Sequence, residues 1–257
     1  MLYSSVFHLH KPPHGLYHPE NPRRLEIALA GLARANLQPF IKVIDRLEDR
    51  YYSYRDRVHS RDYVMFIDEV GRAGEKFIDG DTYVCDHSFY VATHAVGCSV
   101  YAVEQALETA EHMVFALVRP PGHHVGARGR ALGAPTQGFC IFNNVAAAAL
   151  YAVDRGFRPV VVLDIDVHHG NGTQEIFWYN PEVVHIDVHE HGIYPGTGAL
   201  EDLGGGEGYG SKVNIPLYPY SSDDDYIYVF REIVAPLIYS VRPRAVILSA
   251  GFDAYRD

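Results

Sequence analysis

Five short apolar runs, none of which alternates between apolar and polar residues, constrain the fold of this chain more than any other feature. They cover residues 113–118, 160–163, 183–186, 212–217 and 245–248. A strand with one face in water alternates apolar and polar side chains, whereas a strand covered on both faces does not. Segments with helical periodicity separate the runs, as crossovers between parallel strands require. The sequence therefore predicts an α/β fold of three layers, αβα, with a mainly parallel central sheet.

The helical segments carry recognisable start and stop signals. Asn21 and Pro22 suit the N-cap and first position of one helix, and Ser60 is expected to cap another. Gly156 suits the position after a helix end. Three aspartates, 223–225, suit the positive end of a helix dipole. The predicted helices cover residues 23–37, 61–70, 88–110, 143–155 and 223–241.

Composition limits the class of protein. A chain of 257 residues with 47% hydrophobic residues can bury one large core, so we expect a single domain, 1–257. The net charge of −10, with lysine at only four positions, argues against direct binding to nucleic acid. No segment reaches the ~20 apolar residues of a membrane span. The three cysteines, Cys85, Cys98 and Cys140, form no CxxC pair, which favours a reducing compartment, the cytoplasm.

Polar clusters follow four of the five apolar runs. They read RPPGHH, DIDVHHGNGT, DVHEHGIYPGTG and SAGFDA. Each cluster comes where a predicted strand ends, and ligands of open α/β sheets bind at the carboxyl ends of the strands. We therefore expect the four clusters to meet in one crevice.

The second cluster predicts a metal site. Asp164, Asp166 and His168 are two residues apart, so along an extended strand they point to one face. Asp166 and His168 could hold one cation, and Asp253 is the natural third ligand. Such a set leaves zinc an open position for water and substrate, although iron(II) or cobalt would also fit. The alternative is structural, with aspartates that cap helices and histidines that satisfy carbonyls, but so many buried charges in one place favour a cation.

The first cluster predicts proton chemistry. The adjacent His123 and His124 could act as acid and base on an activated water if a second group orients each of them. Asp164 and Asn171 are the expected orienting residues. A carboxylate stabilises an imidazolium and an amide does not, so the two histidines should titrate differently. The alternative is that both only line a surface.

Together these motifs carry a family resemblance. RPPGHH, GFCIFNN, VVVLDIDVHHGNGTQ, YPGTG and SAGFDA, in this order, resemble the arginase-related histone deacetylase superfamily over most of the chain. Asn171 stands where class I members have aspartate, which is similar to class II and to bacterial and archaeal acetylpolyamine amidohydrolases. The resemblance implies the arginase/deacetylase fold.

The resemblance also implies roles for the site residues. It implies zinc ligands at Asp166, His168 and Asp253, tandem catalytic histidines at His123 and His124, and orienting residues at Asp164 and Asn171. Phe139 and Tyr194 match the walls of a narrow substrate channel, where Tyr194 replaces a usual phenylalanine, and Asp81 matches a rim carboxylate that holds the substrate backbone. A potassium ion is implied near Asp164, Asp166, His168, Asp187 and Val188, mainly through backbone oxygens. A second is implied near Phe177, Asn180, Val183 and Tyr226.

The expected function is zinc-dependent hydrolysis of acetyl-lysine in peptides or of an acetylated small amine such as a polyamine. His124 would abstract the proton and His123 would assist. Family members continue past GFDA into a glycine-rich loop whose tyrosine stabilises the oxyanion, so we expect the C-terminal part of the family domain to be absent here. A non-catalytic acyl-amine-binding homologue is therefore the alternative, and an arginase-like two-metal hydrolase is a third. The sequence leaves the oligomeric state and the physiological substrate open.

Overall fold

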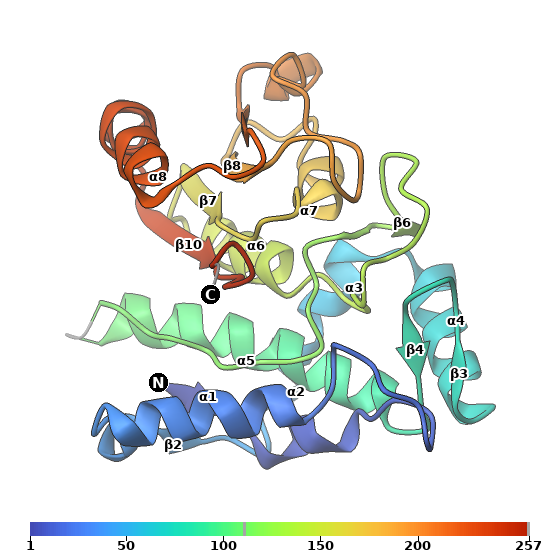
Figure 1. The fold of residues 1–257 in the computed structure, drawn as a ribbon. Helices are drawn as coiled ribbons and strands as arrows, with labels where there is room; N and C mark the ends of the chain where they lie inside the picture. Colours follow the sequence, from blue (N-terminus) through green and yellow to red (C-terminus); the bar gives the residue numbers. More distant parts are fainter. Residues whose placement is uncertain (110–111, 256–257) are drawn as a thin grey trace.

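The central sheet is parallel throughout. The computed structural model describes residues 1–109 and 112–255, and its largest sheet has four strands in the order β10-β7-β8-β9 (Figure 1). β7 (Val160–Asp164) pairs with β10 (Ala245–Ser249) and with β8 (Val183–Glu190), and β8 pairs with β9 (Lys212–Leu217). All three pairings are parallel, as the apolar runs predicted.

Helices lie on both faces of this sheet, which gives the predicted three layers. The edge strand β10 is the exception to the expected burial on two faces, since Val246 and Leu248 are 49% and 51% exposed. Val160 and Val162 of β7 belong to the core cluster that includes α5 (Ser88–Glu108) and α6 (Asn144–Asp154). Val161 and Leu163 pack on the opposite face with α8 (Asp223–Val229) and α9 (Ala235–Val241). Successive residues of β7 thus enter different cores, which is why this strand does not alternate.

The N-terminal elements form a further layer on the far side of α5 (Figure 1). Phe7 of the short helix η1 (Ser5–Leu9) and Leu25 of α1 (Arg23–Arg34) pack with Val91, Ala95 and Cys98 of α5. α5 is therefore buried between two sets of elements. Cys98 of α5 is buried there, and Cys85 and Cys140 are also buried and unpaired.

Most helix ends follow the predicted signals. Ser60 caps α4 (Arg61–Arg72) by accepting from the Tyr63 amide, and Gly156 follows α6 with a φ of 83°. The segment 223–241 is not one regular helix, because a π-helical turn, η4 (Phe230–Val234), separates α8 from α9. Ser222, rather than the aspartates alone, starts α8 through a capping box.

The prediction of a sheet strand at 113–118 is wrong. This segment makes one parallel bridge, from Ala116 to Leu2, outside the four-stranded sheet. Leu2 belongs to β1 (Leu2–Tyr3), which pairs with β2 (Lys42–Val43). Met113 and Phe115 of this run are 83% and 37% exposed, so its apolar character did not indicate a strand covered on both faces. The RPPGHH loop therefore follows a peripheral segment instead of a strand of the main sheet.

The remaining elements are short. They are η2 (Gln38–Phe40), α2 (Asp49–Tyr52), α3 (Tyr54–Val58), β3 (Lys76–Phe77), β4 (Tyr83–Val84), β5 (Val125–Gly126), β6 (Gly129–Arg130), α7 (Asn171–Ile176) and η3 (Gly206–Gly208). None of the helices among the described residues is long and apolar enough to span a membrane.

Candidate active site

Three of the predicted metal ligands lie together at the carboxyl ends of two neighbouring strands. Asp166 and His168 follow β7, and Asp253 follows β10. Their candidate ligand atoms all lie within 4.8 Å of one another. Nδ1 of His168 lies 3.0 Å from Oδ1 of Asp166 and 3.0 Å from Oδ2 of Asp253.

This group suits a divalent transition metal. Two carboxylates and one imidazole form a three-ligand set of the kind that leaves zinc an open position. The side chains of His168 and Asp253 are 34% and 44% exposed, so water can reach the group. The spacing and the adjacent open surface therefore both fit a catalytic ion.

Gly251 makes room for the group of Asp166, His168 and Asp253, and it was not among the predicted site residues. A Cβ at position 251 would lie 2.0 Å from Oδ2 of Asp166. The backbone after β10 can approach the carboxylate only because it carries no side chain there. The available signal was the glycine directly before Phe252 and Asp253 in SAGFDA.

His123 is held as the charged member of the histidine pair. Its Nδ1 lies 3.0 Å from Oδ2 of Asp164, which is fully buried. Burial by itself lowers the pKa of His123, but the charges of Asp164 and Asp166 outweigh that effect and raise it to about 10. His123 is therefore an imidazolium at neutral pH.

His124 is held as the neutral member. The Asn171 side chain donates from Nδ2 to the Ala131 carbonyl at 2.9 Å, so its Oδ1 is the atom that faces His124. Nδ1 of His124 donates to that oxygen at 2.9 Å, which leaves Nε2 with a free lone pair. Burial, followed by the positive charge of His123, holds the pKa of His124 well below its ordinary value. The two rings, with centroids 3.9 Å apart, thus differ in charge.

The predicted channel residues lie around this pair. The Tyr194 ring stands edge-on to the His124 ring at 4.9 Å and to the His168 ring at 6.0 Å. Phe139 packs edge-on against His18 at 4.8 Å, and Nε2 of His18 lies 2.9 Å from the backbone oxygen of Asp81. Both predicted wall residues and the rim carboxylate are half-buried.

A second group of possible metal ligands lies next to the first, in the interior of the protein. Asp164, His185 and Asp187 are fully buried, and their ligand atoms lie within 4.8 Å of one another. Burial, together with the charge of Asp164, raises the pKa of Asp187 to about 6. Nε2 of His185 lies 3.5 Å from Oδ2 of Asp187, yet neither ring nitrogen of His185 makes a hydrogen bond within the described part of the chain. Two adjacent buried carboxylates and an unsatisfied imidazole fit a bound cation.

The second cluster corrects the expected grouping. Strand geometry predicted that Asp164 converges with Asp166 and His168, but it lies with His185 and Asp187. Its contact with His123 is the one expected. β7 ends at Asp164, so the two-residue period of a strand does not extend to the residues that follow. His185 was missed, although it precedes Asp187 by two positions in β8 and so shares its face. Val188, expected to contribute a backbone oxygen, points its side chain into the core on the other face.

Two of the oxygen atoms expected around a second potassium ion, those of Asn180 and Val183, are bonded to a lysine side chain instead. Nζ of the fully buried Lys212 donates to the backbone oxygens of Val183 at 2.9 Å and Asn180 at 3.4 Å. It also lies 2.6 Å from Oγ and 3.2 Å from the backbone oxygen of Ser211. Tyr226, a residue of α8, instead packs against the core on that face of the sheet. The Lys212 amine therefore stands where that ion was expected, and because burial lowers its pKa to about 7 it is charged only in part at neutral pH.

Comparisons with known proteins show what the chain is similar to. The family model described as histone deacetylase domain matches residues 18–257. An uncharacterized protein of Methanocaldococcus jannaschii is 44% identical over 255 residues, which cover 99% of this chain and 72% of that protein. Histone deacetylase 15 of Arabidopsis thaliana is 38% identical over 260 residues, which cover 100% of this chain but only 45% of that protein.

A solved structure extends the comparison to the fold. The acetylpolyamine aminohydrolase from Burkholderia pseudomallei superposes with a TM-score of 0.85 at 26% identity, covering 100% of this chain and 83% of that one. The chain is thus similar throughout to two kinds of amide hydrolase, while it spans less than half of the plant relative's length.

Proposed function

Because the chain belongs to the histone deacetylase family, within its class II-like or acetylpolyamine amidohydrolase-like part, we propose that it is a zinc-dependent deacetylase of acetyl-lysine or acetylated polyamines. One observation carries the proposal: an imidazolium and a neutral imidazole lie side by side next to an open three-ligand metal group. Amide hydrolysis needs a proton acceptor and a proton donor at one electrophilic centre, and this arrangement supplies both.

Asp166, His168 and Asp253 would hold the zinc ion. Such an ion, when bound, polarises a carbonyl and lowers the pKa of water toward ~7. The group lies next to the histidine pair, since Nε2 of His123 lies 3.9 Å from Oδ2 of Asp166. An acetyl group presented there would lie within reach of both imidazoles.

His124 suits the role of general base. Its Nδ1 proton is committed to Asn171, so the lone pair at Nε2 can take a proton from the attacking water. A low pKa keeps that nitrogen unprotonated at neutral pH. His123 suits the complementary role, because Nδ1 is held by Asp164 and the Nε2 proton remains to donate to the oxyanion or to the leaving amine.

The buried cluster of Asp164, His185 and Asp187 would hold a monovalent cation, for which we propose potassium, with a backbone oxygen of Val188 as a further ligand. A cation there would stabilise the buried carboxylates and so keep Asp164 in place behind His123. We further propose a reducing compartment such as the cytoplasm, in keeping with three buried, unpaired cysteines.

The test is to load the purified chain with zinc, determine bound metal by mass spectrometry, and measure acetate release from an acetyl-lysine peptide and from N-acetylspermidine. We expect one tightly bound zinc ion and acetate release that His124→Ala abolishes. His191→Ala is the matched control, since this histidine is exposed. Zinc and substrate binding without any acetate release would contradict the proposal and favour a non-catalytic acyl-amine-binding protein. Two bound transition metal ions would favour an arginase-like hydrolase.

A further inference from the structure

The hydroxyl of Tyr194 is connected to the rim carboxylate of Asp81 through one intervening residue. It donates to the backbone oxygen of Thr136 at 3.0 Å, and the Thr136 hydroxyl donates to Oδ2 of Asp81 at 2.6 Å. Tyr194 follows β8, Thr136 precedes α6, and Asp81 lies between β3 and β4. Three segments distant in sequence are thereby joined at one side of the candidate active site.

The carboxylate at the end of this connection is held at both oxygens. Oδ1 of Asp81 accepts from the Thr82 hydroxyl at 3.0 Å while Oδ2 accepts from Thr136. Each carboxylate oxygen can accept a second hydrogen bond, so Asp81 keeps capacity for N–H donors of a ligand. Its orientation toward such donors is set by the two hydroxyl groups.

The other end of the connection lies beside the proposed base. The Tyr194 ring stands perpendicular to the His124 ring with centroids 4.9 Å apart. The hydrogen bond from its hydroxyl to the Thr136 carbonyl therefore fixes the position of the loop around residue 136 relative to His124. Through that loop it also affects the position of Asp81. The Tyr194 hydroxyl is thus one of the contacts that fix Asp81 relative to His124, together with the contact of His18 to the Asp81 backbone oxygen.

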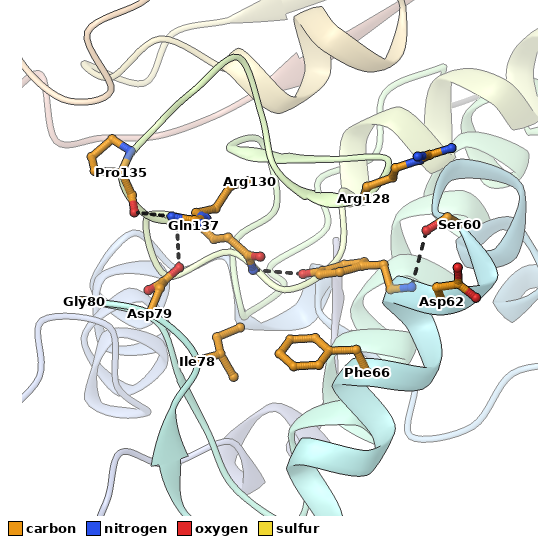
Figure 2. Close-up of a pocket in the computed structure, with 11 residues that line it drawn as sticks. Ser60, Asp62, Phe66, Ile78, Asp79, Gly80, Arg128, Arg130, Pro135 and Gln137 are labelled. Carbon is orange, nitrogen blue, oxygen red and sulfur yellow. Dashed lines mark hydrogen bonds between the residues drawn. The ribbon is translucent and has the colours of Figure 1, made fainter.

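A pocket lies beside the loops that carry Thr136 and Asp81, so these loops have room to move unless other contacts hold them. A cavity of about 650 Å³ lies behind them, lined by both loops, by α4 and by the exposed Arg128 and Arg130 (Figure 2). At this pocket, the backbone N–H of Gln137 donates to Oδ2 of Asp79 at 2.8 Å, and the side-chain Nε2 of Gln137 donates to the Tyr63 hydroxyl at 2.8 Å.

Those contacts join the two loops to each other and to α4, but they do not position the pair relative to β8. Since the pocket is open to solvent and no side chain fills it, the loops have room for a small displacement into it. The bond from Tyr194 opposes that shift from the side of the active site.

We propose that Tyr194, acting through Thr136, positions Asp81 so that the site prefers acetyl-lysine within a peptide to acetylated small amines. The inference rests on the proposed function and names its substrate class. Two adjacent backbone N–H groups form directional hydrogen bonds that a misplaced carboxylate loses, whereas an acetylated diamine has no such groups to align. Tyr194 is in this sense a positioning residue, with its effect on binding rather than on proton transfer.

The experiment compares an acetyl-lysine peptide with N-acetylcadaverine, which reproduces the acetylated side chain without the flanking amides. Dissociation constants are measured by calorimetry on the zinc-loaded protein, and kcat and KM are measured where turnover occurs. We expect the wild type to bind the peptide more tightly. Tyr194→Phe and Thr136→Val should each lower the peptide preference by about three- to tenfold, the loss of one hydrogen bond, and should do so mainly through KM.

Two further measurements separate positioning from general damage. The double variant should lose no more than either single variant, because both changes interrupt the same connection. Tyr239→Phe, at a residue that is 82% exposed on α9, is the matched control and should leave the preference unchanged.

An equal loss of affinity for both ligands would overturn the proposal, and so would an additive double variant or a wild type without peptide preference. Because the preference is read from binding, a wild type that binds but releases no acetate would contradict the proposed deacetylase activity while still deciding this inference.

Discussion

Gly251 and Asp166 are in such close contact that a methyl group on the glycine would lie 2.0 Å from the carboxylate oxygen Oδ2. The two residues come from loops after neighbouring parallel strands, β10 and β7, whose pairing extends to Ser249 and Asp164. The metal group therefore depends on a backbone approach that a single atom would prevent.

Gly251→Ala should displace Asp166 and weaken zinc binding by about 10- to 100-fold, in the range seen when groups that orient metal ligands are disturbed. Competition with a chromogenic chelator would measure this affinity. Gly31→Ala in α1 is the control, because a Cβ there meets no atom within 4 Å and alanine favours a helix. Unchanged zinc affinity in Gly251→Ala would show that the Asp166 position is not the one required for metal binding.

Asn171→Asp should move the acidic limb of the pH–rate profile to higher pH. His124 must be unprotonated to act as a base, so activity falls as pH drops through its pKa. A carboxylate in place of the Asn171 amide would stabilise the imidazolium and so raise the pKa of His124. The profile of kcat/KM against pH measures the shift. Asn21→Asp, at the start of α1, is the control, and an unshifted limb would remove His124 from the role of base.

His59 should make the protein sensitive to acid. This buried ring accepts from the Asn143 amide at Nε2, 2.9 Å, and its Nδ1 lies 3.0 Å from the Gly126 carbonyl, so it is neutral. Burial lowers its pKa to about 3, below the ordinary value of 6.5. Between those values the unfolded chain binds a proton that the folded one excludes, so stability is complete above pH 6.5 and declines as pH falls toward 3.

His59→Gln removes the group that binds this proton in the unfolded chain, and with it the pH dependence of stability that His59 causes. The slope of unfolding free energy against pH, measured by denaturant titration between about pH 4 and 6, should fall by up to about 1.4 kcal/mol per pH unit. The exposed His191 offers a control, His191→Gln, which should keep the wild-type slope. If both variants give the same slope, His59 is not neutral in the folded state.

Lys212→Ala should destabilise the protein and make it respond to potassium. Without the ammonium group, the buried carbonyls of Val183 and Asn180 lose their donor, at a cost of about 1–3 kcal/mol for each unsatisfied group. A potassium ion could then occupy the oxygen atoms that Lys212 now contacts. The midpoint of thermal unfolding in KCl, relative to NaCl at equal concentration, should rise more for the variant than for the wild type.

Lys76→Ala, at an exposed lysine of β3, controls for the loss of one positive charge. An equal potassium response in Lys212→Ala and the wild type would contradict the view that the ammonium group stands where an ion would bind.

Local sequence was sufficient for the sheet and for most ligands of the candidate site. The run 212–217 became β9 with the same bounds, and the run 160–163 became β7 with one residue more. Burial on two faces leaves a local signature, the absence of alternation, which can be read without knowing the neighbours. Asp166, His168 and Asp253 could be grouped for a similar reason, since the carboxyl ends of parallel strands meet at one edge.

Contacts between distant segments were decided by the tertiary structure. The run 113–118 has the same apolar character as the true sheet strands, yet it bridges to Leu2 instead. Asp164 does not converge with Asp166 and His168, because β7 ends at that residue. Lys212 contacts oxygens that the family resemblance had assigned to an ion. The link from Tyr194 to Asp81 has no trace in the local pattern at all. Periodicity records whether a side chain is buried, whereas hydrogen bonds and charge pairs depend on which atoms of remote segments arrive within about 3 Å, and only the packed chain sets those distances.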